Sequence, residues 1–103
     1  MNARRAERRN IAAQVRLRRS GSLNYVVHAY DLSQTGCRLE FVQRPRISEW
    51  VWVKFEGLAA IESRVRWTDG NMLGIEFTNP IDPRVLDVLV ARLESDGSIG
   101  ANK

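Results

Sequence analysis

Alternating apolar and polar residues constrain the fold of this chain more than any other feature. The alternation recurs in five short segments, at residues 14–18, 37–41, 50–55, 61–67 and 73–77. A sixth segment, at residues 25–31, is rich in the β-branched and aromatic residues that favour strands. Since successive side chains of a strand point to opposite faces, a period of two predicts strands with one buried face. The sequence therefore predicts six short β-strands.

The pattern after residues 73–77, the last predicted strand, is that of an α-helix. Asp82 is suited to cap a helix, and Pro83 is suited to its first position. An apolar stripe of helical spacing follows, made of Val85, Leu86, Leu89, Val90 and Leu93. Six antiparallel strands and one helix are compatible with either a barrel or a sandwich, and the pattern alone leaves both open.

Length and charge bound what the protein can do. A chain of 103 residues has room for one domain, which buries roughly two-thirds of its unfolded surface and leaves little space for a catalytic cavity. The net charge is +4, and only Lys54 and Lys103 among the 16 basic residues are lysine. Eight of the 14 arginines lie at or before Arg38, so we expect a basic end and an anionic partner. Genomic base composition is the alternative explanation of the arginine excess.

Three features point to a cytoplasmic protein. The single cysteine, Cys37, excludes an internal disulfide. No apolar stretch approaches the roughly 20 residues that span a bilayer, so no membrane insertion is expected. The first residues are charged and lack the apolar region of a signal peptide.

An arginine cluster lies close to the N-terminus, at Arg4, Arg5, Arg8 and Arg9. Guanidinium groups bind phosphates and the acceptor edge of guanine in bidentate fashion. We interpret residues 1–10 as an arm that stays flexible unless a ligand holds it, residues 11–95 as the domain, and residues 96–103 as a disordered tail. Taken alone, the cluster favours a solvated basic arm over a binding site.

A second motif follows the predicted second strand, with Asp31, Ser33 and Gly36 at spacings i, i+2 and i+5. A carboxylate can accept hydrogen bonds from guanine N1 and N2, and a hydroxyl can bind base or phosphate. Glycine lets the backbone bend tightly and approach a ligand. The same three residue types also form ordinary turns, which is the alternative reading of this motif.

Together the two motifs resemble those of the PilZ domain, a bacterial receptor for cyclic di-GMP. The RxxxR motif of that family is matched twice, by Arg4 with Arg8 and by Arg5 with Arg9, and DxSxxG is matched at residues 31–36. The rest of the chain to about residue 95 is similar too, including a Leu-Gly-Ile-Glu-Phe sequence at residues 73–77 and the final helix. The resemblance implies an all-β fold, a six-stranded antiparallel β-barrel with a C-terminal α-helix.

The resemblance also implies a ligand and a set of site residues. The arginines of either RxxxR frame would clamp the phosphates and guanine edges of cyclic di-GMP. Asp31 would read guanine, Ser33 would add a hydroxyl, and Gly36 would admit the ligand. No metal or other cofactor is expected, because His28 and Cys37 have no partners at metal-ligand spacing.

Catalysis is not expected either. Ser33 has no histidine at a spacing that suggests a nucleophile and its base. His28 is interpreted as a surface or half-buried strand residue, and Cys37 as a small core residue. The protein is therefore predicted to be no enzyme.

Four further side chains receive structural interpretations. Trp50 and Trp52 fall opposite the apolar face of their segment, so they need a cover, for which the helix or a loop is preferred over a partner protein. Trp67 shares the parity of buried positions and is predicted to be core. Arg38 is assigned to a solvated strand face.

The sequence thus predicts a stand-alone, non-catalytic receptor for cyclic di-GMP. The ligand would bridge the arm and the barrel near Asp31, and ordering of the arm would signal to a downstream protein partner. The alternative is a degenerate PilZ-like adaptor that binds a protein and no nucleotide, which the intact motifs argue against. A third reading is a barrel that binds single-stranded nucleic acid on interleaved aromatic and basic residues. Trp50, Trp52 and Lys54 supply part of that pattern, but nucleic acid is not expected because the arginines concentrate in the arm.

Overall fold

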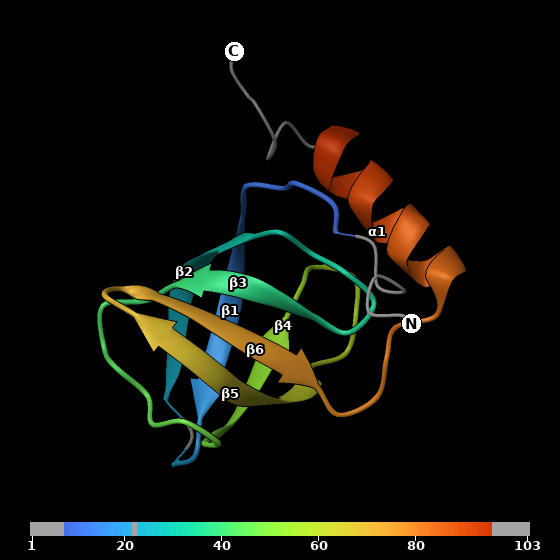
Figure 1. The fold of residues 1–103 in the computed structure, drawn as a ribbon. Helices are drawn as coiled ribbons and strands as arrows, with labels where there is room; N and C mark the ends of the chain where they lie inside the picture. The colour runs from blue at the N-terminus through green and yellow to red at the C-terminus, as the bar shows by residue number, and fades with distance from the viewer. Residues whose placement is uncertain (1–7, 22, 96–103) are drawn as a thin grey trace.

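Six strands and one helix follow one another in the order that the sequence predicts (Figure 1). The computed structural model describes residues 8–21 and 23–95. Residues 1–7 of the predicted arm and the whole predicted tail, residues 96–103, lie outside the described residues. The elements are β1 (Ala13–Arg19), β2 (Asn24–Tyr30), β3 (Gly36–Glu40), β4 (Trp50–Lys54), β5 (Ile61–Asp69), β6 (Met72–Phe77) and α1 (Pro83–Ser95).

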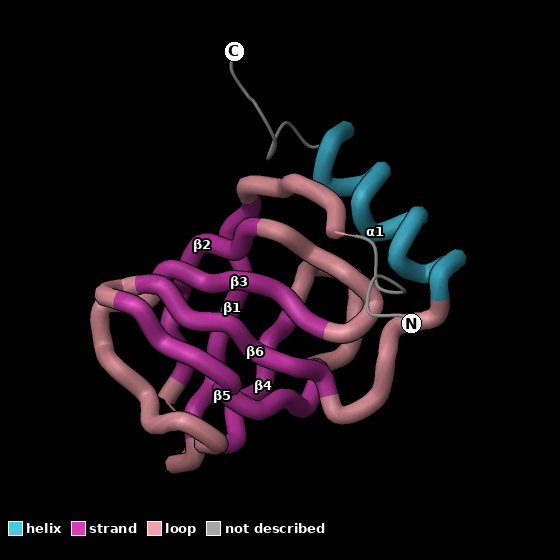
Figure 2. Tube along the Cα trace, viewed as in Figure 1, coloured by secondary structure: helices cyan, strands magenta, loops and turns pink. Residues whose placement is uncertain are grey.

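The strands form a closed antiparallel barrel in the order β1-β2-β3-β6-β5-β4, with β4 paired back onto β1. Figure 2 shows the strands curling around one interior, with the helix outside it. The alternation pattern left a barrel and a sandwich open, and the closed strand order excludes the sandwich. The six-stranded antiparallel barrel with a C-terminal helix is therefore confirmed.

Alternation along each strand fills the barrel. In β1, Ala13, Val15 and Leu17 are buried, whereas Gln14 and Arg16 are exposed. The same parity buries Cys37, as predicted, and one continuous core cluster results. Burial raises the pKa of the Cys37 thiol, so the thiol stays protonated at neutral pH.

Helix α1 lies across one open end of the barrel (Figure 1). Its buried side chains join the core cluster and are Leu86, Leu89, Val90 and Leu93. Asp82 caps the helix as predicted, because its Oδ1 accepts a hydrogen bond of 2.8 Å from the Arg84 backbone N–H. Val85 departs from the predicted stripe, since it remains 40% exposed.

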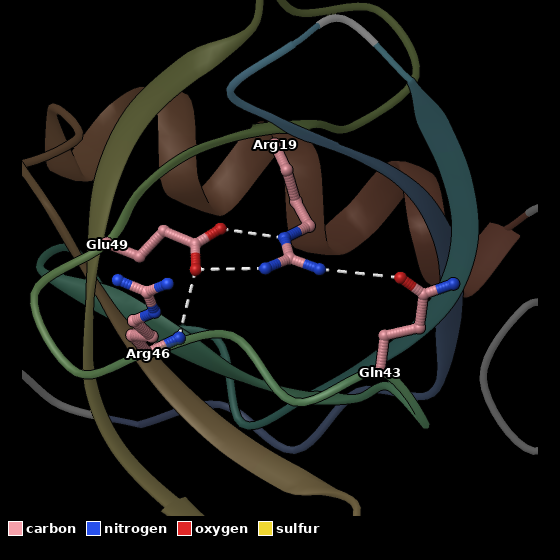
Figure 3. Close-up of polar contacts among 4 residues, drawn as sticks. All are labelled: Arg19, Gln43, Arg46 and Glu49. Atoms are coloured by element: carbon pink, nitrogen blue, oxygen red, sulfur yellow. Dashed lines mark hydrogen bonds and ion pairs between the residues drawn. The ribbon is translucent and has the colours of Figure 1, made fainter.

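A polar cluster lies at the other end of the barrel (Figure 3). Arg19 donates to both carboxylate oxygens of Glu49, over 2.7 and 3.0 Å, and the Arg46 backbone N–H donates to the same carboxylate over 2.9 Å. Arg19 also donates to Gln43 over 3.4 Å. These bonds tie the segment between β3 and β4 to the end of β1. The bond from Arg19 is the main cause that lowers the pKa of the Glu49 carboxyl.

The predicted cover of Trp50 and Trp52 is wrong. In the described part of the chain, both rings lie under arginines of the neighbouring strands, and Trp50 remains 41% exposed. The Arg18 guanidinium carbon lies 4.2 Å from the Trp52 ring centroid, and that of Arg64 lies 4.3 Å from the Trp50 centroid. Cross-strand pairing explains the contacts, since Arg18 lies opposite Trp52 and Arg64 opposite Trp50.

The prediction that Trp67 belongs to the core is also wrong. The pairing of β5 with β6 shifts register between Val65 and Trp67, so two positions of β5 span one position of β6. Such a β-bulge reverses the parity of every residue after it. Trp67 therefore points outward and is 43% exposed.

Candidate functional site

A surface pocket of about 380 Å³ lies where β3, β5 and β6 meet the segment that joins β2 to β3. Its lining residues are Arg8, Asp31, Ser33, Thr35, Gly36, Cys37, Arg38, Arg66, Trp67, Gly74, Ile75 and Glu76. The lining includes three guanidinium groups, two carboxylates and one indole. It therefore offers groups that bind phosphate, groups that accept hydrogen bonds from a base, and an aromatic surface.

Asp31 turns the chain away from the end of β2. Its φ is +51°, in the left-handed region that aspartate tolerates better than most residues. The turn places its carboxylate at the pocket, where Oδ2 lies 3.0 Å from Nε of Arg38. Arg38 Nε makes no aligned hydrogen bond, so the contact is an ion pair. Arg38, assigned from sequence to a solvated strand face, thus lies at the pocket beside the motif aspartate.

Ser33 organises the segment between β2 and β3. Its backbone N–H donates to the Gly36 carbonyl over 2.9 Å, and its hydroxyl accepts from the Thr35 N–H over 3.2 Å. The hydroxyl also donates to the Gly36 carbonyl over 3.3 Å. Ser33 is buried, and these bonds fix the shape of the pocket wall. A contact of Ser33 with a ligand stays a prediction.

Gly36 has a different structural role from the expected one. Its φ is not positive, so no unusual bend requires glycine there. A Cβ at this position would lie 2.1 Å from the Ile75 carbonyl oxygen. Glycine is required because β6 passes too close for any side chain.

The N-terminal arginines separate into two groups. Arg9 pairs with Leu32 through two backbone hydrogen bonds of 2.7 and 2.9 Å, which hold the N-terminal segment against the pocket wall. The Arg9 side chain forms an ion pair with Asp87 of α1, whereas Arg8 lines the pocket. Neighbouring residues of an extended segment point to opposite sides, which explains the difference. Arg4 and Arg5 lie outside the described residues.

Sequence reasoning missed Arg66, Glu76 and Trp67 as pocket residues, and Trp67 is the aromatic one among them. Its indole packs directly onto Gly74 of β6, where an added Cβ would lie 2.2 Å from Nε1. Glycine opposite tryptophan leaves room for the ring to lie against the barrel wall. The glycine at residue 74 is a signal for such a contact, but the bulge that turns Trp67 outward has no clear sequence signal.

The described residues carry neither a metal cluster nor a membrane span. Within residues 8–21 and 23–95, no group of three His, Cys, Asp or Glu side chains could hold a metal ion. Over the same residues, no helix has the length and apolar character needed to cross a bilayer. His28 is exposed on β2.

The comparisons with known proteins agree with this geometry. The family model of the PilZ domain, which is a non-catalytic family, matches residues 2–95. A search of curated proteins finds no significant match. The matched region includes the whole barrel, the helix and every residue of the pocket, and so the chain belongs to the PilZ domain family.

Proposed function

We propose that this PilZ domain is a receptor for cyclic di-GMP, and that the pocket beside Asp31 is its binding site. The observation that supports the proposal best is that one pocket brings the DxSxxG residues together with Arg8. These residues lie more than 20 positions apart in the sequence, and the pairing of Arg9 with Leu32 joins them.

Each part of the ligand has a suitable partner in the pocket. Arg8 and Arg38 would bind phosphate, because guanidinium forks match phosphate oxygens. The Asp31 carboxylate would accept from guanine N1 and N2. Binding would exchange part of the Asp31–Arg38 ion pair for contacts with the ligand, which leaves no buried charge without a partner.

Trp67 adds a surface for the base. An exposed indole on a rigid strand can stack on a purine, and stacking on an aromatic side chain is worth about 1–3 kcal/mol per base. The ring is held by its contact with Gly74, so little conformational freedom is lost on binding.

The signal would pass through the N-terminal segment. In the proposal, Arg4 joins Arg8 on the ligand, since residues four apart on an extended segment share a side. The ligand then stabilises only the conformation with the arm in place, which shifts the population toward it. A cytoplasmic location and a downstream protein partner are part of the same proposal.

The test is a calorimetric titration with cyclic di-GMP, with GTP as a competitor. We expect Arg8→Ala and Asp31→Ala to weaken binding, whereas Arg44→Ala, which removes the same charge from an exposed loop, leaves it unchanged. The Asp31 result decides the mechanism, because a purely electrostatic site would bind an anion more tightly without that carboxylate. A loss of about 1–3 kcal/mol is expected if Asp31 reads guanine.

If the folded protein binds no cyclic di-GMP, the result supports the alternative function, a degenerate PilZ-like adaptor that binds a protein and no nucleotide. Equal displacement of the ligand by GTP would instead identify the pocket as a general anion site.

A further inference from the structure

The outer surface of β1, β4 and β5 combines tryptophans with basic side chains. Its members, named here the Arg–Trp face, are Arg16, Arg18, Trp50, Trp52, Lys54 and Arg64. They project outward because the buried positions of the same strands alternate with them. Two acidic side chains border the face, since Glu62 lies opposite Trp52 and Glu76 of β6 lies opposite Arg64. Four of its six members are basic, so the face keeps a net positive charge.

Two arginine–tryptophan stacks form the centre of this face. Arg18 of β1 lies over Trp52, and Arg64 of β5 lies over Trp50, with guanidinium carbons 4.2 and 4.3 Å from the ring centroids. Both tryptophans belong to β4, so the stacks lie side by side on one strand. Both arginines remain partly exposed. Each indole thus holds a planar cation at the surface in a fixed orientation.

A second observation concerns Arg16 and Lys54, which lie directly opposite each other on β1 and β4. Like charges in opposite cross-strand positions destabilise a sheet. The Lys54 ammonium donates a hydrogen bond to the Leu58 carbonyl, which helps to solvate its charge without neutralising it. Glu56 lines one surface pocket with Arg16 and Lys54 and offsets part of their charge, and a bound anion would compensate the rest.

We propose that the Arg–Trp face binds single-stranded nucleic acid. Unpaired bases stack on the guanidinium planes of Arg18 and Arg64, which gives columns of base, arginine and tryptophan. Arg16 and Lys54 contact the phosphates beside them. A duplex does not fit this chemistry, because its bases are already stacked on each other. An acidic peptide would use the charges but not the planar surfaces.

The closed barrel brings together basic and aromatic residues that are far apart in the sequence. The expectation against nucleic acid rested on arginines gathered in the arm. Closure of the barrel brings Arg18 from the first strand and Arg64 from the fifth onto the tryptophans of the fourth. Aromatic and basic groups are therefore interleaved on one surface, as sequence-independent single-strand binding requires.

The Arg–Trp face is distinct from the pocket. The pocket contains none of the six residues of the face, and it reaches β5 at Arg66, whose Nε lies 3.1 Å from Glu76. The proposal thus stands independently of cyclic di-GMP binding, and the two can be tested with separate variants.

The test uses fluorescence anisotropy of a labelled oligothymidine of about 15 nucleotides, a length near the upper end for one small barrel. We expect saturable binding by the full chain that weakens as salt rises. Arg18→Lys and Arg64→Lys should each weaken it about fivefold or more, because lysine keeps the charge but loses the planar stack. Arg44→Lys, the matched change in an exposed loop, should leave binding unchanged. Asp31→Ala should also leave it unchanged.

Four results would overturn the proposal. They are an absence of saturable binding, wild-type affinity in both lysine variants, equal weakening by Arg44→Lys, and a loss in Asp31→Ala that assigns the oligonucleotide to the pocket. Competition by polyglutamate as effective as by unlabelled oligothymidine would instead indicate an acidic protein as the partner. Circular dichroism of each variant confirms that the barrel is folded.

Discussion

Replacement of Gly36 by alanine tests why the third motif residue is glycine. The added methyl group would lie 2.1 Å from the Ile75 carbonyl oxygen, whereas ordinary contact begins at 3.4 Å. The obstacle is backbone of the paired strand β6, so no side-chain rotation relieves it. The two strands would have to separate by roughly 1 Å near the pairing of Gly36 with Glu76, and overpacking of this kind costs about 1–3 kcal/mol.

Because the clash is with backbone, we place the steric cost near the upper end of that range. Alanine restrains the unfolded chain more than glycine does, which offsets about 0.5–1 kcal/mol. The net loss expected for Gly36→Ala is about 2 kcal/mol, or roughly 8–16 °C in Tm for a domain of this size. Urea unfolding followed by tryptophan fluorescence measures it.

Gly70→Ala is the matched control. No atom lies within 4 Å of a Cβ at Gly70, but its φ is +61°, so only the left-handed backbone penalises alanine there. That penalty is about 1–2 kcal/mol, and the unfolded-state offset applies to it as it does to Gly36→Ala. If Gly36→Ala unfolds within about 0.5 kcal/mol of wild type, or is milder than Gly70→Ala, the close approach of β6 does not explain the glycine. A role at the ligand would then be the remaining explanation.

Three other predictions concern separate parts of the molecule. Trp67→Ala should weaken cyclic di-GMP binding about fivefold or more with little change in stability, measured by calorimetry and urea unfolding, and unchanged affinity would remove the stacking role. Arg19 lowers the pKa of the Glu49 carboxyl, so this pair stabilises the fold above the unfolded-state pKa and loses that contribution as pH falls through the folded-state pKa. Glu49→Gln should therefore be less stable than wild type at pH 7, and the difference should shrink below about pH 4 in urea unfolding; a constant difference would refute the linkage. Asp87→Asn, which weakens the exposed ion pair with Arg9, should change the free energy of unfolding by about 1 kcal/mol or less, and a larger loss would mean that this contact anchors the N-terminal segment.

Local patterns predicted the elements well because each element has one apolar side. Period-two alternation located five strands, β-branched and aromatic residues located the one at residues 25–31, and Asp82 with Pro83 located the start of the helix. The prediction of a closed barrel required the family resemblance. Alternation indicates which side of a strand is buried, but it does not indicate which strands are neighbours. The same limit explains why the cover of Trp50 and Trp52 was predicted wrongly. The arginines that cover them, Arg18 and Arg64, are distant from them in the sequence.

The candidate site was predictable in part. The motif residues Asp31, Ser33 and Gly36 do line one pocket with Arg8, whereas Arg9 turns to the helix because consecutive side chains alternate. Parity failed at Trp67, where a single bulge moves an apparently buried ring to the surface. A bulge depends on how two strands pair, and that information is absent from the pattern of one strand.

The closed barrel restricts how this domain can communicate. Among the described strands, each one has a hydrogen-bonded neighbour on both sides, so none offers a free edge for β-augmentation by a partner. Recognition must therefore act on side chains, loops or the helix. Moving any one strand would break two ladders at once, which makes the barrel a rigid frame.

Mobility in response to a ligand is thus left to the parts attached to that frame. Arg9 binds the pocket wall through its backbone and α1 through its side chain. The N-terminal segment is consequently a mechanical link between the pocket and the helix. If the proposed ligand pulls on this segment, it would act on α1 without deforming a single strand.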